Sequence, residues 1–194
     1  MRILITTLLF AGLLLSGAAS AEDPASPEEA FTYIGAAKCR MCHKKEAIGQ
    51  QYVVWSNGPH AKAFATLATE EAIAEAAKKG IENPQTAAEC LRCHATAAAA
   101  GLPADAPLTL DEGVSCEGCH GPGSEYFRKR VMEGIAAGEM PCEDFGLTVI
   151  TEKTCVGCHT PEGNSFYKEF AFEEALKRIA HPVPAAPAGE SAGD

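Results

Sequence analysis

CRMCH, at residues 39–43, is the first of four copies of one five-residue pattern in this chain. The other copies are CLRCH at 90–94, CEGCH at 116–120 and CVGCH at 155–159. C-x-x-C-H is the attachment sequence of c-type haem, in which two thiols bond the porphyrin and the adjacent imidazole binds the iron. Four copies predict four covalently bound haems. The expected thioether residues are Cys39, Cys42, Cys90, Cys93, Cys116, Cys119, Cys155 and Cys158.

Paired cysteines have other uses, and two four-cysteine zinc ribbons or redox dithiols are the alternatives. Neither requires a histidine directly after the second cysteine. The chain has six histidines, and four of them occupy that position. This enrichment favours haem over zinc. The expected proximal ligands, on the near side of the four irons, are His43, His94, His120 and His159.

The N-terminus has the pattern of an export signal. Arg2 is the only charge before an apolar run from Ile3 to Leu15, and small residues at 19–21 suit cleavage. We therefore expect a signal peptide over residues 1–21, with a retained anchor helix as the alternative. The apolar run is too short to span a bilayer comfortably, so no transmembrane anchor is expected after cleavage. Export predicts a periplasmic or secreted protein.

The rest of the chain is expected to form one tetrahaem domain at residues 22–181 and a disordered Pro/Ala/Gly tail at 182–194. Four haems would leave only about 43 residues for each. A chain of that length cannot build an ordinary apolar core and also bury four porphyrins, so the porphyrins must supply the core. The expected fold is mainly α, with helices and loops wrapped around four closely packed haems and few strands.

Local patterns place the helices and loops. The segments expected to be helical are 33–55, broken by the first motif, then 59–79, a segment capped by Ser124, and 170–180. Gly80 is expected to end the second of these helices. Residues 97–108, rich in Ala, Gly and Pro, are expected to form a loop over the second haem, and residues 145–150 a short extended run.

The composition is acidic, with 16 basic and 26 acidic residues and a net charge of −10. Removing Arg2 with the signal leaves 15 basic residues, and the net charge becomes −11. This charge disfavours nucleic acid and anionic lipid as partners. A redox protein with a basic docking face is the expected partner, and its association should weaken with salt.

The ligand on the far side of each iron largely determines what a haem does. Two histidines make a low-spin electron carrier, whereas an empty position leaves the iron open to small molecules. After the proximal histidines, only His60 and His181 remain. His60 is expected in the first turn of a helix, where the dipole favours the neutral imidazole, and His181 follows the last helix. We predict that both bind iron, the alternatives being a solvent or core histidine at 60 and a helix cap at 181.

Two haems then lack a far-side histidine. Met132 is a candidate thioether ligand and Lys129 a candidate amine ligand, although a core methionine and a solvated lysine are simpler interpretations. Cys142, the ninth cysteine, could bind iron, join two chains or be an ordinary buried thiol. At least one haem is therefore expected to be five-coordinate or weakly ligated.

Three further stretches have a familiar order: Trp55 followed by HAKA at 60–63, GV at 113–114 before CEGCH, and GPG at 121–123. With the four motifs, they make the chain resemble the tetrahaem cytochrome c-554 family, known for carrying electrons from hydroxylamine oxidation. The resemblance implies closely stacked haem pairs, three bis-histidine haems and one five-coordinate haem. It also implies that His60 and His181 are far-side ligands.

The chain departs from that family in two respects. Best-known members have another ligand histidine shortly after Gly-Pro-Gly, whereas residues 124–132 here contain none. The haem that would take this ligand is bound by Met132 or Lys129, or is open. The best-known member is also lysine-rich, whereas this chain is acidic, so its partner does not carry over.

The sequence thus predicts an electron carrier between redox proteins. An alternative is a haem enzyme that reduces or oxidises a small nitrogen oxide or peroxide at an open iron, with Tyr126, Arg128 and Arg130 near a candidate site. A third possibility is a subunit of a haem filament, in which neighbouring chains donate ligands. No Ser-His-Asp arrangement, phosphate-binding loop or paired-carboxylate site suggests another chemistry.

Overall fold

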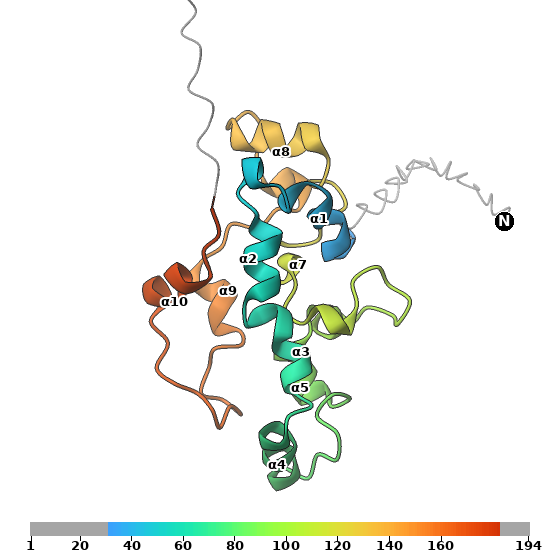
Figure 1. Cartoon of the computed structure of the whole chain (residues 1–194), viewed down its shortest axis with the longest axis vertical. Helices are drawn as coiled ribbons and strands as arrows, with labels where there is room; N and C mark the ends of the chain where they lie inside the picture. The colour runs from blue at the N-terminus through green and yellow to red at the C-terminus, as the bar shows by residue number, and fades with distance from the viewer. Residues whose placement is uncertain (1–30, 183–194) are drawn as a thin grey trace, which may run out of the picture. The chain divides into compact units, whose positions relative to one another are not determined.

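The computed structural model describes residues 31–182, and the regular structure of this part of the chain is helical (Figure 1). No strand occurs within it. The mainly α fold predicted from the sequence is therefore confirmed. The predicted signal peptide and the tail beyond Pro182 lie outside the described residues.

The helices are short and joined by loops and single turns of 3-10 helix. Their bounds are α1 Ala36–His43, η1 Glu46–Ile48, α2 Gln51–Asn57, η2 His60–Lys62, α3 Ala63–Thr66, α4 Glu70–Lys78, α5 Ala88–His94, α6 Thr96–Ala99, η3 Leu110–Glu112, α7 Cys116–His120, α8 Lys129–Ala136, η4 Glu143–Phe145, α9 Glu152–Val156 and α10 Phe172–Ile179.

Each C-x-x-C-H motif involves one of these short helices. The helices α1, α5 and α7 end at the motif histidine, whereas α9 ends at Val156, so that His159 lies in the following turn. In a helix, residues three apart in sequence share one face. In the first three motifs, the two cysteines therefore point to the same side, as attachment to one porphyrin requires.

The first two predicted helices are divided. In the first, the break follows the motif, because Gly49 and Gln50 have positive φ angles of 99° and 52° before α2 begins. The second is broken between α3 and α4, where the Thr69 hydroxyl accepts a 3.2 Å hydrogen bond from Ala72 N and caps α4. Gly80, with φ +73°, follows the end of α4 as predicted.

The second half of the chain departs from prediction at Ser124. This residue does not cap α8, which begins at Lys129. Instead, Ser124 N donates to Thr32 O and Ser124 Oγ accepts from Thr32 N, both at 3.1 Å. The predicted extended run at 145–150 contains no strand, and residues 97–108 begin as α6 before becoming a loop.

The polypeptide alone has a small apolar core. One cluster contains Leu67, Leu91 and Ala95, and two of the three largest fully buried side chains elsewhere, Glu117 and Ser115, are polar. Several large apolar side chains are instead exposed, including Met41 at 57%, Val149 at 68% and Phe166 at 54%. Within residues 31–182, no helix is both long and apolar enough to cross a membrane.

Candidate haem sites

The first and third motifs lie against each other. Their helices, α1 and α7, are in contact, although Cys39 and Cys116 are far apart in sequence. A hydrogen bond between these two thiols lowers the pKa of Cys39 and raises that of Cys116. Two haem attachment sites are thereby placed side by side.

The second and fourth motifs form another pair. Burial, the charge of Cys93 and a hydrogen bond between the thiols raise the pKa of Cys158 to about 12. Cys93 and Cys158 also line one pocket, together with Gly118 of the third motif. The pKa of Cys119 is raised mainly by burial and then by the charge of Cys155. The third motif is therefore also close to the fourth. The third motif therefore lies near each of the other three motifs.

Two pairs of imidazoles face each other. The ring centres of His60 and His159 are 6.2 Å apart, and those of His120 and His181 are 5.9 Å apart. Metal–nitrogen bonds of about 2 Å, with about 1 Å from nitrogen to ring centre, separate two imidazoles on opposite sides of one metal by about 6 Å. Both pairs therefore have the separation expected of two axial ligands on a single iron.

The surroundings of these imidazoles favour the neutral form that binds metals. Burial, together with the neighbouring His181 and His43, lowers the pKa of His120 to about 4. Burial is also the main cause that lowers the pKa of His60, His159 and His181. Each ring is thus neutral at physiological pH.

The other two motif histidines are oriented by hydrogen bonds at Nδ1. His43 Nδ1 lies 3.1 Å from Gln51 Oε1, and His94 Nδ1 lies 2.8 Å from Ala63 O. An imidazole that donates from one nitrogen presents the other to a metal. Gln51 is itself held, because its Nε2 donates to Pro182 O at 2.8 Å.

These residues fit c-type haem. The buried Nδ1 of His181 has no hydrogen-bond partner, which suits a ring near a group other than the polypeptide. Among residues 31–182, no three His, Cys, Asp or Glu side chains converge as a metal-ion cluster, so the ligand set of a zinc ribbon is not found there. All nine cysteines are free in the polypeptide.

A hydrogen-bonded crossing fixes the position of His60. Trp55 Nε1 donates to Val114 O at 2.9 Å, and Val114 N donates to His60 O at 2.9 Å. Gly113, with φ +60°, passes so close that a Cβ there would lie 2.5 Å from His60 O. Two of the three stretches that carry the family resemblance, Trp55 with residues 60–63 and residues 113–114, thus meet at one histidine.

The other candidate ligands remain predictions. Met132 is half-buried on α8. Lys129 is exposed and pairs with Glu133 at 3.3 Å, as a solvated lysine would. Arg128 pairs with Glu125 at 2.7 Å and Arg130 is exposed.

Tyr126 differs from these neighbours because it is buried. Its hydroxyl donates to Gly121 O at 2.7 Å. Burial, followed by the charge of Cys39, raises the pKa of its phenol above the ordinary value. The phenol is therefore held between the first and third motifs as a hydrogen-bond donor.

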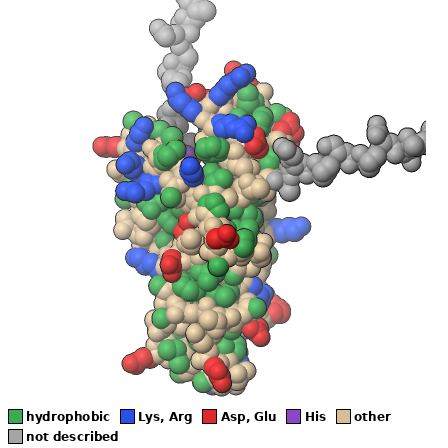
Figure 2. Space-filling view, turned by 90° about the vertical axis from the view of Figure 1, so that its right-hand side faces the viewer, with side chains coloured by type: hydrophobic (Ala, Val, Ile, Leu, Met, Phe, Trp, Pro, Cys, Tyr) green, Lys and Arg blue, Asp and Glu red, His purple; other side chains and the backbone are tan. Residues whose placement is uncertain are grey.

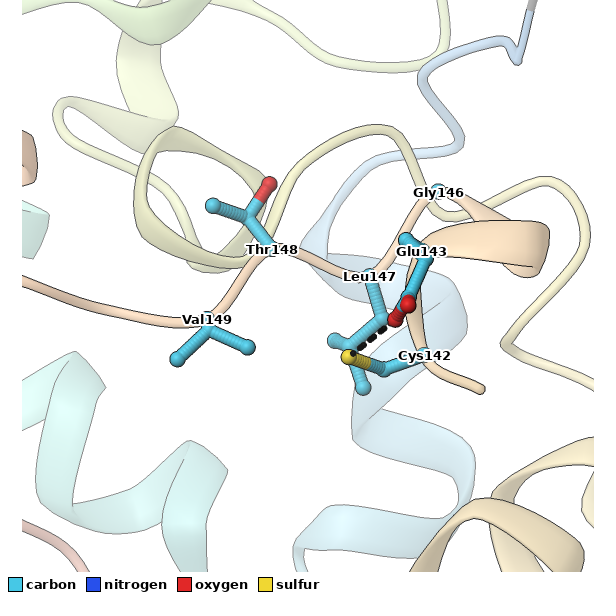
Figure 3. Close-up of a pocket in the computed structure, with 6 residues that line it drawn as sticks. All are labelled: Cys142, Glu143, Gly146, Leu147, Thr148 and Val149. Atoms are coloured by element: carbon cyan, nitrogen blue, oxygen red, sulfur yellow. Dashed lines mark hydrogen bonds between the residues drawn. The ribbon is translucent and has the colours of Figure 1, made fainter. Parts of the chain in front are cut away.

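Cys142 lies at an open pocket formed by residues 142–149, where its thiol points toward the Glu143 carboxylate (Figure 3). Cys142 Sγ donates to Glu143 Oε2 at 3.3 Å, and this bond is the main cause that raises the pKa of the thiol. A protonated thiol is a poor metal ligand.

Sequence analysis missed several residues that support the sites. Gln51 orients His43, Phe170 stacks on His159 with ring centres 4.7 Å apart, and the Glu117 carboxylate lies within the third motif. Local sequence gives no signal for the first two. A charged residue inside a motif whose helix must be buried could have marked Glu117.

Comparison with known proteins agrees with these features. The family described as cytochrome c554 and c-prime matches residues 38–121. Cytochrome c-554 of Nitrosomonas europaea is 31% identical over 134 residues, covering 65% of this chain and 52% of that protein. This chain therefore spans about half the length of its curated relative.

A solved structure, the reduced state of cytochrome c554 from Nitrosomonas europaea, matches with a TM-score of 0.47 and 22% identity. The match covers 76% of this chain and 78% of that one. In its matched sequence and its haem motifs, this chain is therefore similar to the cytochrome c554 and c-prime family over residues 38–121 and to cytochrome c-554 over 134 residues.

Proposed function

We propose that this protein is a periplasmic electron carrier with four covalently bound haems. Each haem iron, when bound, takes up or gives up one electron as it passes between the ferric and ferrous states. The observation that carries the proposal is the proximity of the motifs: α1 contacts α7, and Cys93 and Cys158 line one pocket with Gly118 of the third motif. This arrangement keeps four redox sites close together within one short chain.

The polypeptide has three roles in this proposal. The eight motif cysteines anchor the haems, and the motif histidines bind the irons from the near side. His60 is the second ligand at the fourth motif, and His181 is the second ligand at the third. Their 6.2 Å and 5.9 Å ring separations support this assignment.

Electron paramagnetic resonance of the fully oxidised protein tests the proposed ligand set, because it counts high-spin and low-spin irons together. We expect two low-spin bis-histidine haems, at the third and fourth motifs. In His60→Ala, the fourth-motif haem should become high-spin, and in His181→Ala, the third-motif haem should. A spectrum unchanged in either variant contradicts that ligand.

For a partner, we propose a redox protein with a basic docking face that binds near the second motif. Residues 70–112 contain eight acidic and three basic residues, whereas 38–45, around the first motif, contain four basic residues and no acidic ones. Figure 2 shows Lys and Arg gathered toward the upper part of one face and Asp and Glu more widely spread. A basic redox protein should bind more weakly in the exposed-site variant Glu89→Lys than in Lys44→Glu.

A second function, at an open haem, is favoured by one observation. Of the four motif histidines, only His120 and His159 face another imidazole. His43 and His94 are instead oriented through Nδ1 by Gln51 and by the Ala63 carbonyl. Irons without a second strong ligand can bind small molecules such as nitric oxide, nitrite, hydroxylamine or peroxide.

Carbon monoxide separates the two functions. Added to the ferrous protein, it should change the spectrum of one or both of the haems at the first and second motifs if an open iron is present. No spectral change in any haem would remove the enzyme hypothesis, and the electron-carrier proposal would stand. If carbon monoxide does change the spectrum, turnover of nitric oxide, hydroxylamine or peroxide is the further result that an enzyme requires.

The periplasmic location is part of the proposal and rests on residues 1–21. When the full chain is expressed, we expect the mature protein from Glu22 onward in the periplasmic fraction with haem attached. A variant that lacks residues 2–21 should stay in the cytoplasm without covalent haem. Haem attachment to this shortened variant would contradict an export requirement.

A further inference from the structure

Glu117 lies inside the third motif, CEGCH, between the two cysteines, and its side chain is buried, with 2% of the residue exposed. A buried carboxylate requires hydrogen-bond donors. Its Oε1 accepts from Ile34 N at 3.0 Å and from Gly123 N at 2.7 Å, and its Oε2 accepts from Gly35 N at 2.8 Å. All of these hydrogen bonds come from backbone N–H groups.

These contacts connect the third motif with the first. Ile34 and Gly35 lead directly into α1, which carries the first motif, and Gly35 supplies no side-chain cap. The Glu112 carboxylate extends the same arrangement, because its Oε2 accepts from Ala36 N at 2.9 Å and from Ser115 Oγ at 3.0 Å. The start of α1 is therefore capped by carboxylates from the third-motif segment.

The Glu117 carboxylate also holds the glycine turn that follows the third motif. A Cβ at Gly123 would lie 2.9 Å from Ile34 Cδ1 and 3.1 Å from Glu117 Oε1, so the backbone must pass closely there. Tyr126, whose hydroxyl holds Gly121 O, packs in the same region. Glu117 thus joins both sides of the third motif to the entry of the first.

The carboxylate carries a charge as well as hydrogen bonds. An ionised carboxylate only accepts hydrogen bonds, and the contacts of Glu117 are all donors to it. Its charge acts on Cys39 of the first motif, and Cys116 is its neighbour in sequence. A buried negative charge stabilises the ferric iron relative to the ferrous iron, because the ferric form carries one more positive charge.

We propose that Glu117 is a positioning residue that fixes the first haem against the third, and that its buried charge lowers the reduction potentials of both. This inference rests on the proposed function, since it assumes that the motifs carry haem. In an interior of effective dielectric constant about 20, a unit charge near an iron changes the ratio of oxidised to reduced iron by on the order of tenfold.

The test is a redox titration of the purified full-length holoprotein, in which an electrode supplies one electron to each ferric iron. In Glu117→Gln, two of the four one-electron steps should move to higher potential. The expected shift is about tenfold in the oxidised-to-reduced ratio, which is about 59 mV for one electron. The other two steps should stay in place.

Matched variants separate charge from packing. Glu117→Asp keeps the charge but shortens the side chain, so it should lower Tm. The oxidised-to-reduced ratio of each of the four haems should stay within about twofold of its wild-type value. Glu89→Gln removes an exposed charge next to a motif cysteine, Cys90, and its potentials should stay near the wild-type values because water screens the site.

Unchanged potentials in a haem-loaded Glu117→Gln would overturn the inference, and so would a shift equal to that of Glu89→Gln. If Glu117→Gln accumulates without haem, Glu117→Asp decides. Wild-type potentials with a lowered Tm support the inference, and shifted potentials despite the retained charge contradict it. Haem content, measured separately, shows whether the proposed function itself has failed, because that failure leaves the wild-type protein without covalent haem.

Discussion

Gly113→Ala should dislodge His60 without replacing any haem-binding residue. Gly113 has φ +60° and ψ −133°, a backbone conformation that strains any other residue by about 1–3 kcal/mol. The new Cβ would lie 2.5 Å from His60 O and 3.1 Å from Ala61 O. Overpacking of this kind costs a further amount of about 1–3 kcal/mol. The total of about 2–6 kcal/mol corresponds to a Tm lowered by about 5–20 °C.

Two measurements on the holoprotein check this prediction. Thermal unfolding should show the lowered Tm, and electron paramagnetic resonance should show one low-spin haem becoming high-spin as the His60 backbone moves. Gly101→Ala is the control, because Gly101 has φ +66° but no atom within 4 Å of its Cβ position. It should lose only about 1–2 kcal/mol and keep every low-spin haem. Equal Tm values for the two variants, with unchanged spectra, would refute the reasoning.

Three other variants test separate contacts. The double variant His60→Ala/His181→Ala should lose two low-spin haems where each single variant loses one, as counted by electron paramagnetic resonance. Trp55→Phe leaves the Val114 carbonyl without its donor and should lose about 1–3 kcal/mol in thermal unfolding, whereas Tyr52→Phe, which keeps the ring and removes only a hydroxyl, should change little. Tyr126 has a raised pKa, chiefly because burial disfavours the phenolate, so its stabilisation is complete below about pH 10 and lost above it. The Tm of the wild type should therefore fall more steeply above about pH 10 than that of Tyr126→Phe, and parallel curves would contradict this.

The haem anchors could be predicted from sequence because C-x-x-C-H is a local covalent requirement. His60 and His181 followed by counting, since the other four histidines were already assigned. Which motif histidines these two approach could not be predicted. The approaches of His60 to His159 and of His181 to His120 join residues far apart in the sequence.

The predicted helix boundaries were wrong where tertiary contacts outweighed local preference. Ser124 has the composition of a helix cap, but two hydrogen bonds to Thr32 hold it in a different arrangement. The sequence pattern after Pro59 predicts one helix. In the structure, however, Leu67 packs in the apolar cluster and Thr69 caps a new helix. Such breaks arise from packing, so periodicity alone does not reveal them.

The most direct test of the central claim is the intact mass of the purified protein made in a host able to mature c-type cytochromes. The predicted mass is that of the chain from Glu22 onward plus four haems, with only Cys142 left to react with a thiol reagent. A mass equal to the bare polypeptide, with nine reactive cysteines, would contradict it.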